Sequence, residues 1–186
     1  MGKRKQRPTR LSDPRLIPSW VGAGLFWLVG QLPWNALLAI GRGVGHLGWH
    51  LVKKRRHVAL TNIQLCFPEL TAEQQVALAK RSVVSTGEAI LEMAGSFNNH
   101  RIDLDKRLTI EGMEHIQHAR AQGLGVLLLG MHFNSLDVGS RLLGYVLDFY
   151  GVYRPNDNPV IDRLIDKGRC NYMKGSVQRS DIRQMV

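Results

Sequence analysis

The sequence has few of the residues that build disulfide-rich or metal-dependent proteins. Its two cysteines, Cys66 and Cys170, have no paired spacing. A disulfide framework and a zinc site are therefore not suggested, and a reducing compartment fits. A nucleotide-binding loop, a CxxC pair, an HExxH motif and a calcium-binding loop are also missing from the sequence. We therefore expect neither a metal nor a nucleotide cofactor.

Acidic residues are almost missing from the first third of the chain. Residues 1–60 contain eleven Lys or Arg and one acid, Asp13, whereas the remainder is balanced, so this third carries the whole net charge of +10. Basic groups beside apolar sequence favour an anionic membrane surface. A nucleic-acid-binding module would spread its positive charge over a folded face, so we expect no nucleic-acid partner.

Charge of either sign is missing between Leu16 and Gly41. After a basic tail over residues 1–15, we predict a membrane-anchor helix or helical hairpin with interfacial helices over residues 16–52. Pro33 should end or kink its first helix. A secretory signal peptide is the alternative, but no small-residue cleavage site precedes a polar region. The Lys53–Arg56 run that follows is either a solvated charge cluster or a contact with lipid head groups or an acidic partner.

Residues 53–186 predict alternating helices and strands. Helices are expected from Arg56 to Leu65, from a capping box at Thr71 to Asn98, over residues 114–122, over residues 135–143, and from Pro159 with Asn158 as its cap. Strands are expected at residues 108–110, 125–130 and 150–153, and the last residues, from Lys174, show no clear element. This order predicts an α/β fold with right-handed crossovers and an uncovered sheet edge.

The best candidate for chemistry follows the predicted strand at residues 125–130. His132 stands in the loop after it, and Asp137 follows near the start of the next helix. An imidazole can remove the proton of an attacking hydroxyl at neutral pH, and a carboxylate can orient the ring. If Asn134 caps the helix, Asp137 is its third residue, where the helix dipole favours the ionised form.

A structural interpretation of the same residues is equally open, because a helix start often carries an acid at this position. The spacing alone is weak, since His100 and Asp105 repeat it without a preceding strand. Arg154 follows a predicted strand and could hold a phosphate or an oxyanion, although a solvent-exposed arginine is the simpler interpretation.

Several blocks in the same order carry a resemblance to a known family. They are Gln31-Leu-Pro33, Asn62-Ile-Gln-Leu-Cys-Phe-Pro-Glu69, Ile110-Glu-Gly-Met-Glu-His-Ile116, Gly130-Met-His-Phe133 and Gly151-Val-Tyr-Arg-Pro-Asn-Asp-Asn-Pro159. They resemble the Kdo-dependent lauroyl, palmitoleoyl and myristoyl transferases, the late acyltransferases of lipid A biosynthesis. That family is part of the glycerolipid (lysophospholipid) acyltransferase superfamily, which has a His-x4-Asp/Glu motif.

The resemblance, to the lauroyl type or its palmitoleoyl paralogue, implies transfer of a fatty acyl group from acyl carrier protein to a hydroxyl of a Kdo-bearing lipid A precursor, and we expect the group to be lauroyl. The implied location is the bacterial inner membrane, with the catalytic part on the cytoplasmic side. His132 corresponds to the general base and Asp137 to its partner. Arg169 and Arg154 correspond to substrate-binding or oxyanion positions. No metal is implied, and the carrier-protein thioester is a co-substrate.

Members of this family are longer than this chain. The resemblance therefore leads us to expect an N-terminal fragment, in which residues 53–186 form part of a glycerolipid-acyltransferase-like catalytic domain with an incomplete site. A catalytically inactive, membrane-associated fragment is the alternative function.

Overall fold

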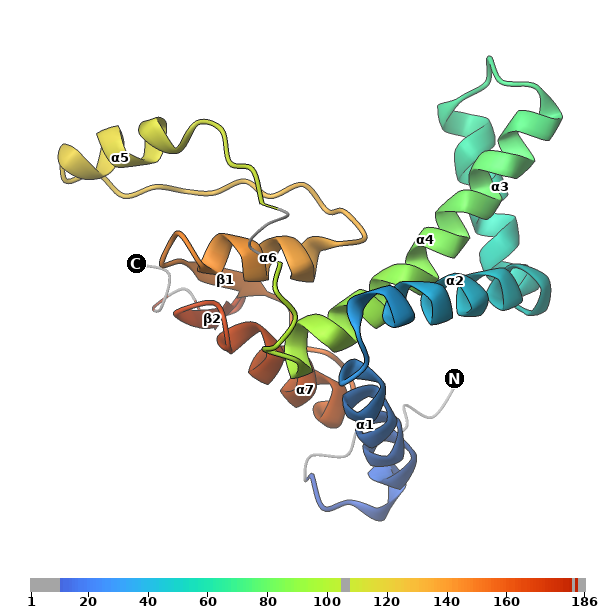
Figure 1. The fold of residues 1–186 in the computed structure, drawn as a ribbon, viewed down its shortest axis with the longest axis horizontal. Coiled ribbons are helices and arrows are strands. Elements are labelled where there is room, and N and C mark those ends of the chain that lie inside the picture. Colours follow the sequence, from blue (N-terminus) through green and yellow to red (C-terminus); the bar gives the residue numbers. More distant parts are fainter. Residues whose placement is uncertain (1–10, 105–107, 182, 184–186) are drawn as a thin grey trace, which may run out of the picture.

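The computed structural model describes residues 11–104, 108–181 and 183, and most of them are helical (Figure 1). A 3-10 turn, η1, covers Pro14–Leu16. The elements that follow are α1 (Ile17–Gly30), α2 (Trp34–Leu51), α3 (Lys53–Cys66), α4 (Ala72–Asn98), α5 (Met113–Ala121), α6 (Leu136–Gly144), β1 (Tyr150–Tyr153), α7 (Pro159–Cys170) and β2 (Gly175–Gln178).

Local sequence signals determine where several of these helices begin and end. Pro33 stands between α1 and α2, as predicted, because it cannot continue the first helix. Thr71 and Gln74 form the predicted capping box at the start of α4. Asn158 caps α7 through its side chain, which accepts hydrogen bonds from two backbone N–H groups, and Pro159 is the first helical residue.

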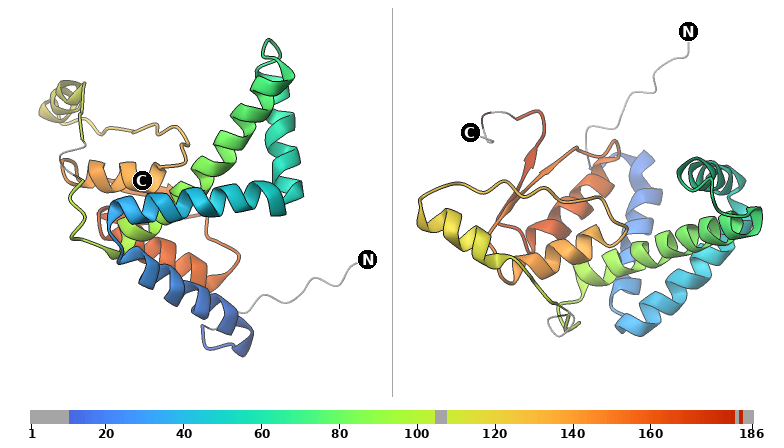
Figure 2. Two further views of the ribbon diagram at one scale, coloured as in Figure 1. Left: turned by 45° about the vertical axis from the view of Figure 1, so that its right-hand side comes forward. Right: turned by 90° about the horizontal axis from the view of Figure 1, so that it is seen from above.

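The long helix α4 organises the molecule, because α1, α2, α3, α6 and α7 all contact it (Figures 1 and 2). Its contact with α2 is a backbone contact made through glycines. A Cβ atom added at Gly45 would lie 2.5 Å from the Cα of Val84, and one added at Gly41 would lie 2.6 Å from the Cα of Glu88. Larger residues at these positions would separate the two helices.

The hydrophobic core lies where the C-terminal end of α4 meets α2 and the following loop. Its buried residues are Leu37, Leu91, Ile102 and Leu104, and Val29, Leu32, Trp34, Val138 and Leu142 pack against them. This core therefore joins the N-terminal helices to α6, the helix that carries Asp137.

The α/β fold class predicted from the sequence is wrong, because the described residues are mostly helical. Only β1 and β2 form a sheet, a parallel pair joined through α7 in which Tyr150 pairs with Gly175. Residues 108–110 and 125–130 are not strands. A strand needs a neighbour for its backbone hydrogen bonds, and none pairs with 125–130 in the described chain. Leu127 and Leu129 are 94% and 96% exposed.

The predicted membrane anchor is also not supported. In the described part of the chain, no helix is both long enough and apolar enough to cross a membrane. The physical reason for α1 is its length, since 14 residues extend only about 21 Å against a hydrocarbon core of about 30 Å. Of the basic tail predicted over residues 1–15, residues 1–10 lie outside the described residues.

Candidate functional site

Two of the predicted site residues, Asp137 and Arg169, meet at the N-terminal end of α6. Asp137 is the second residue of this helix, and its carboxylate accepts a hydrogen bond from Nε of Arg169, near the end of α7, at 2.7 Å. Both side chains are largely buried, with exposed fractions of 16% and 24% respectively. A charge-assisted bond between partly buried groups is stronger than a surface ion pair, so this contact fixes Asp137.

His132 lies in the extended segment before α6, and its side chain is exposed. Within the described chain no hydrogen bond or ion pair joins it to Asp137, whose carboxylate is bound to Arg169 instead. The structure therefore places the two predicted residues five positions apart along one loop and helix start, but it does not connect them.

The start of α6 differs from the prediction in one detail. Asn134 does not cap the helix, because its side-chain amide donates to Oγ of Ser85 on α4 at 3.1 Å. Ser135 is the N-terminal cap residue, without a capping hydrogen bond from its side chain. The bond between Asn134 and Ser85 instead ties the loop after His132 to the long helix.

Arg154 follows β1 directly, as predicted, and its side chain is exposed. No hydrogen bond or ion pair holds it in the described residues, so nothing connects it to Asp137 and Arg169. His100 is exposed, and Asp105, its partner in the repeated spacing, lies outside the described residues.

Sequence reasoning missed Glu92, which lies beside the start of α6. Burial raises the pKa of the Glu92 carboxyl, and the nearby Glu88 raises it further, while a hydrogen bond with Ser135 acts in the opposite direction. A carboxyl with a raised pKa is a stronger proton acceptor once it is ionised. The sequence gives no signal for it, since Glu92 is one acid among the residues of a long helix.

Sequence reasoning also missed Arg141, which is 1% exposed. It stands one helical turn after Asp137 on α6. Its guanidinium donates to the backbone carbonyls of Asn99 (3.1 Å), Ile102 (2.8 Å) and Ser96 (3.3 Å), all at or beyond the C-terminal end of α4. The same group donates to the Tyr145 hydroxyl at 2.8 Å. Arg141 therefore fixes α6, and with it Asp137, against the negative end of the α4 dipole.

The groups at this site suit proton transfer and anion binding. In the described residues, no group of three or more His, Cys, Asp or Glu side chains could hold a metal ion. The site instead offers an exposed imidazole, a fixed carboxylate and an arginine whose terminal nitrogens make no hydrogen bond within the described chain. Such groups can accept a proton and stabilise a developing negative charge.

Comparison with known proteins gives a consistent set of relatives. The bacterial lipid A biosynthesis acyltransferase family matches residues 4–186. Over 180 residues the chain is 37% identical to the lipid A biosynthesis lauroyltransferase of Escherichia coli (strain K12). The aligned residues are 96% of this chain and 58% of that protein. It is 31% identical over 175 residues to the palmitoleoyltransferase of the same organism, with 93% and 56% covered.

A lipid A biosynthesis acyltransferase of Haemophilus influenzae is 34% identical over 177 residues, which are 93% of this chain and 56% of that protein. The chain thus spans a little over half the length of these relatives. No solved structure matches it.

Proposed function

Because the chain belongs to the bacterial lipid A biosynthesis acyltransferase family, we propose that it transfers a fatty acyl group to a hydroxyl of a Kdo-bearing lipid A precursor. The proposed donor is the thioester of acyl carrier protein. The proposed acyl group is lauroyl, supported by the 37% identity to a lauroyltransferase. The proposal includes no metal and no organic cofactor.

In the proposed reaction, the hydroxyl oxygen of the acceptor attacks the thioester carbonyl while His132 accepts the hydroxyl proton. The tetrahedral intermediate then expels the carrier thiolate, which takes up that proton, and an ester remains on the lipid. A neutral imidazole suits this role, because its ordinary pKa lies near neutral pH. The exposed position of His132 in the loop before α6 leaves its ring accessible to a substrate.

The observation that carries the proposal is the ion pair of Asp137 and Arg169 beside this loop. It fixes the Asp137 carboxylate, which can then orient the imidazole once substrate binding brings the His132 ring to it. Arg169 bonds Asp137 through Nε alone, which leaves its terminal nitrogens for the oxyanion or a phosphate. Arg154, exposed after β1, is proposed as a second cation for the substrate.

We propose the cytoplasmic face of the bacterial inner membrane as the place of action. One flank of α2 exposes apolar side chains at helical spacing: Ile40, Val44, Leu47 and Leu51. The basic Lys53–Arg56 run begins α3 immediately after them. Exposed apolar groups beside cations are typical of helices that bind an anionic lipid surface.

Transfer of labelled lauroyl groups from acyl carrier protein to Kdo₂-lipid IVA tests the proposal. We expect the wild-type chain to transfer the label, and His132→Ala to lower the rate by about 10²- to 10⁴-fold. His118→Ala, at an exposed position on α5, serves as the control and should leave the rate unchanged. Undiminished transfer by His132→Ala would remove the imidazole from the mechanism.

A non-catalytic, membrane-associated chain is the second candidate, favoured by the missing bond between His132 and Asp137. It predicts that the chain sediments with phosphatidylglycerol vesicles and transfers no label. Transfer above the background of empty membranes rules it out.

A further inference from the structure

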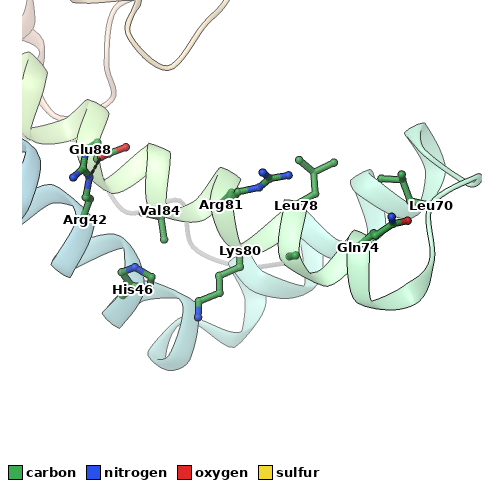
Figure 3. Close-up of a pocket in the computed structure, with 10 residues that line it drawn as sticks. Arg42, His46, Leu70, Gln74, Leu78, Lys80, Arg81, Val84 and Glu88 are labelled. Atoms are coloured by element: carbon green, nitrogen blue, oxygen red, sulfur yellow. Dashed lines mark hydrogen bonds and ion pairs between the residues drawn. The ribbon is translucent and has the colours of Figure 1, made fainter.

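An open groove runs along α4 between Gln74 and Glu88, with part of α2 beside it (Figure 3). Its volume is about 900 Å³, and its lining includes four basic side chains. Arg42 and His46 come from α2, and Lys80 and Arg81 come from α4. The helices α2 and α4 are held together by the backbone contact at Gly45, so the part of the groove that they form is rigid.

The positive charge of the groove is only partly compensated. Glu88, the carboxylate in its lining, forms an ion pair with Arg42, whose Nε lies 2.5 Å from Oε1. Lys80 and Arg81 form no hydrogen bond or ion pair in the part of the chain that the structure describes. The groove therefore presents two free cations to a ligand.

These cations do not converge on one point. In Figure 3 the side chains of Lys80 and Arg81 point to different sides of α4, and Leu78 and Val84 contribute apolar surface beside them. A single phosphate would need donors directed at one position. The arrangement instead suits a ligand that has several separate negative charges and an apolar face.

The groove is also long. Its lining residues on α4 extend from Gln74 to Glu88, which at 1.5 Å per residue is about 21 Å, or four helical turns. Contact along such a length, with apolar groups and charges side by side, is how an amphipathic helix binds in a groove.

The groove faces away from the apolar flank of α2. At 100° per residue, Arg42 and His46 lie roughly 150° around the helix from the middle of the exposed stripe of Ile40, Val44, Leu47 and Leu51. A lipid surface that covers the stripe would therefore not reach into the groove, which remains open to a partner from the aqueous side.

We propose that this groove binds an acidic amphipathic helix of a protein partner, with carboxylates near Lys80 and Arg81 and apolar side chains on Leu78 and Val84. The inference rests on the proposed function only for the identity of the partner, the acidic protein that carries the acyl group. It assigns to the groove the docking of that protein.

Binding of fluorescently labelled acyl carrier protein to the whole 186-residue chain tests this inference. Lys80→Glu with Arg81→Glu should weaken binding about tenfold or more, because like charges then face each other. The matched control is Arg163→Glu with Lys167→Glu on α7, which changes the net charge equally at two exposed positions and should alter binding less than about twofold. Circular dichroism checks that both variants remain helical.

A variant without a charge change separates a helix site from general attraction between opposite charges. Leu78→Ala keeps the helix propensity of α4 and removes apolar contact, and we expect it to weaken binding several-fold. Equal weakening by the groove variant and the α7 control would overturn the inference, as would an absence of carrier binding to the wild-type chain.

Sedimentation with phosphatidylglycerol vesicles tests a lipid as the occupant. If the groove variant loses vesicle binding while carrier binding is unchanged, the groove is a lipid site and the inference is wrong. Because binding and acyl transfer are measured separately, carrier binding at the groove without transfer would uphold the inference while the proposed function fails. Acyl transfer by the wild type, together with normal carrier binding by the groove variant, would uphold the proposed function and overturn the inference.

Discussion

Replacing Arg141 with methionine should destabilise the chain by about 3 kcal/mol. The guanidinium is buried at the C-terminal end of α4 and donates to three backbone carbonyls and one hydroxyl. Methionine fills much of the same volume without any donor. The variant therefore isolates the effect of the hydrogen bonds from that of a cavity.

The cost of losing the guanidinium differs among the three carbonyl groups. Ile102 loses the hydrogen bond that its buried carbonyl accepts, at a cost of about 1 to 3 kcal/mol. Asn99 and Ser96 lose less, because their carbonyls also accept bonds from the Ile102 N–H and the Tyr172 hydroxyl respectively. Release of a buried charge offsets part of the sum, which gives a net loss of about 3 kcal/mol.

Urea unfolding followed by circular dichroism at 222 nm measures this loss as a lower midpoint with an unchanged slope. Arg141→Lys should recover only part of it, because an ammonium group cannot reproduce the planar fork that reaches several carbonyls. Arg101→Met is the control. This exposed arginine stands next to Ile102 in the loop after α4, and its replacement should change the free energy of unfolding by less than about 0.5 kcal/mol. A midpoint for Arg141→Met equal to that of the control would refute the reasoning.

Three further predictions test other contacts. Gly45→Ala should lower the free energy of unfolding by about 1 to 3 kcal/mol, because its Cβ would lie 2.5 Å from the Cα of Val84. The control, Gly43→Ala, enters open space and should stabilise α2 by up to about 1 kcal/mol. Equal shifts in melting temperature for the two variants would contradict the close packing. Glu92→Gln should raise the melting temperature at pH 7. The raised pKa of Glu92 makes the stability of the wild type fall as the pH rises above 4.5, the ordinary pKa, and below that pH the wild type loses no stability from this group. A lower melting temperature of the variant at pH 7 would contradict this prediction. Thr71→Ala should cost about 1 kcal/mol through loss of the α4 cap, and a urea midpoint equal to that of the wild type would show that the cap is not needed.

The sequence predicts well those features that depend on neighbouring residues. The capping box of Thr71, the cap at Asn158 and the break at Pro33 are local, and the structure confirms each of them. Gly123 directly follows the helix predicted over residues 114–122, and it has a positive φ of 70° just after α5. Each of these signals acts within one helical turn, so a single stretch of sequence contains all of the relevant information.

The strands were predicted less well, because a strand depends on a distant partner. The apolar run at residues 125–130 has the composition of a buried strand, yet no strand pairs with it in the described chain. Conversely, Gly175–Gln178 lacks a clear apolar pattern but pairs with β1 along its whole length. Composition alone cannot supply the pairing.

The site shows the same division. Residue type and local context selected His132 and Asp137, but the partner of Asp137 in the structure is Arg169, 32 residues further along the chain. The burial of Arg141 contradicts the general expectation that arginine is exposed. Both contacts arise from the packing of α6 against α4 and α7, which no local pattern in the sequence reveals.

The central claim is that the paired Asp137 and Arg169 act as one unit in acyl transfer. Lauroyl transfer from acyl carrier protein to Kdo₂-lipid IVA, measured for the wild type, Asp137→Asn, Arg169→Gln and the double variant, tests it most directly. We predict transfer by the wild type, a loss of about 10²-fold or more in each single variant, and no further loss in the double variant. Absence of wild-type transfer, or losses that multiply in the double variant, would contradict the claim.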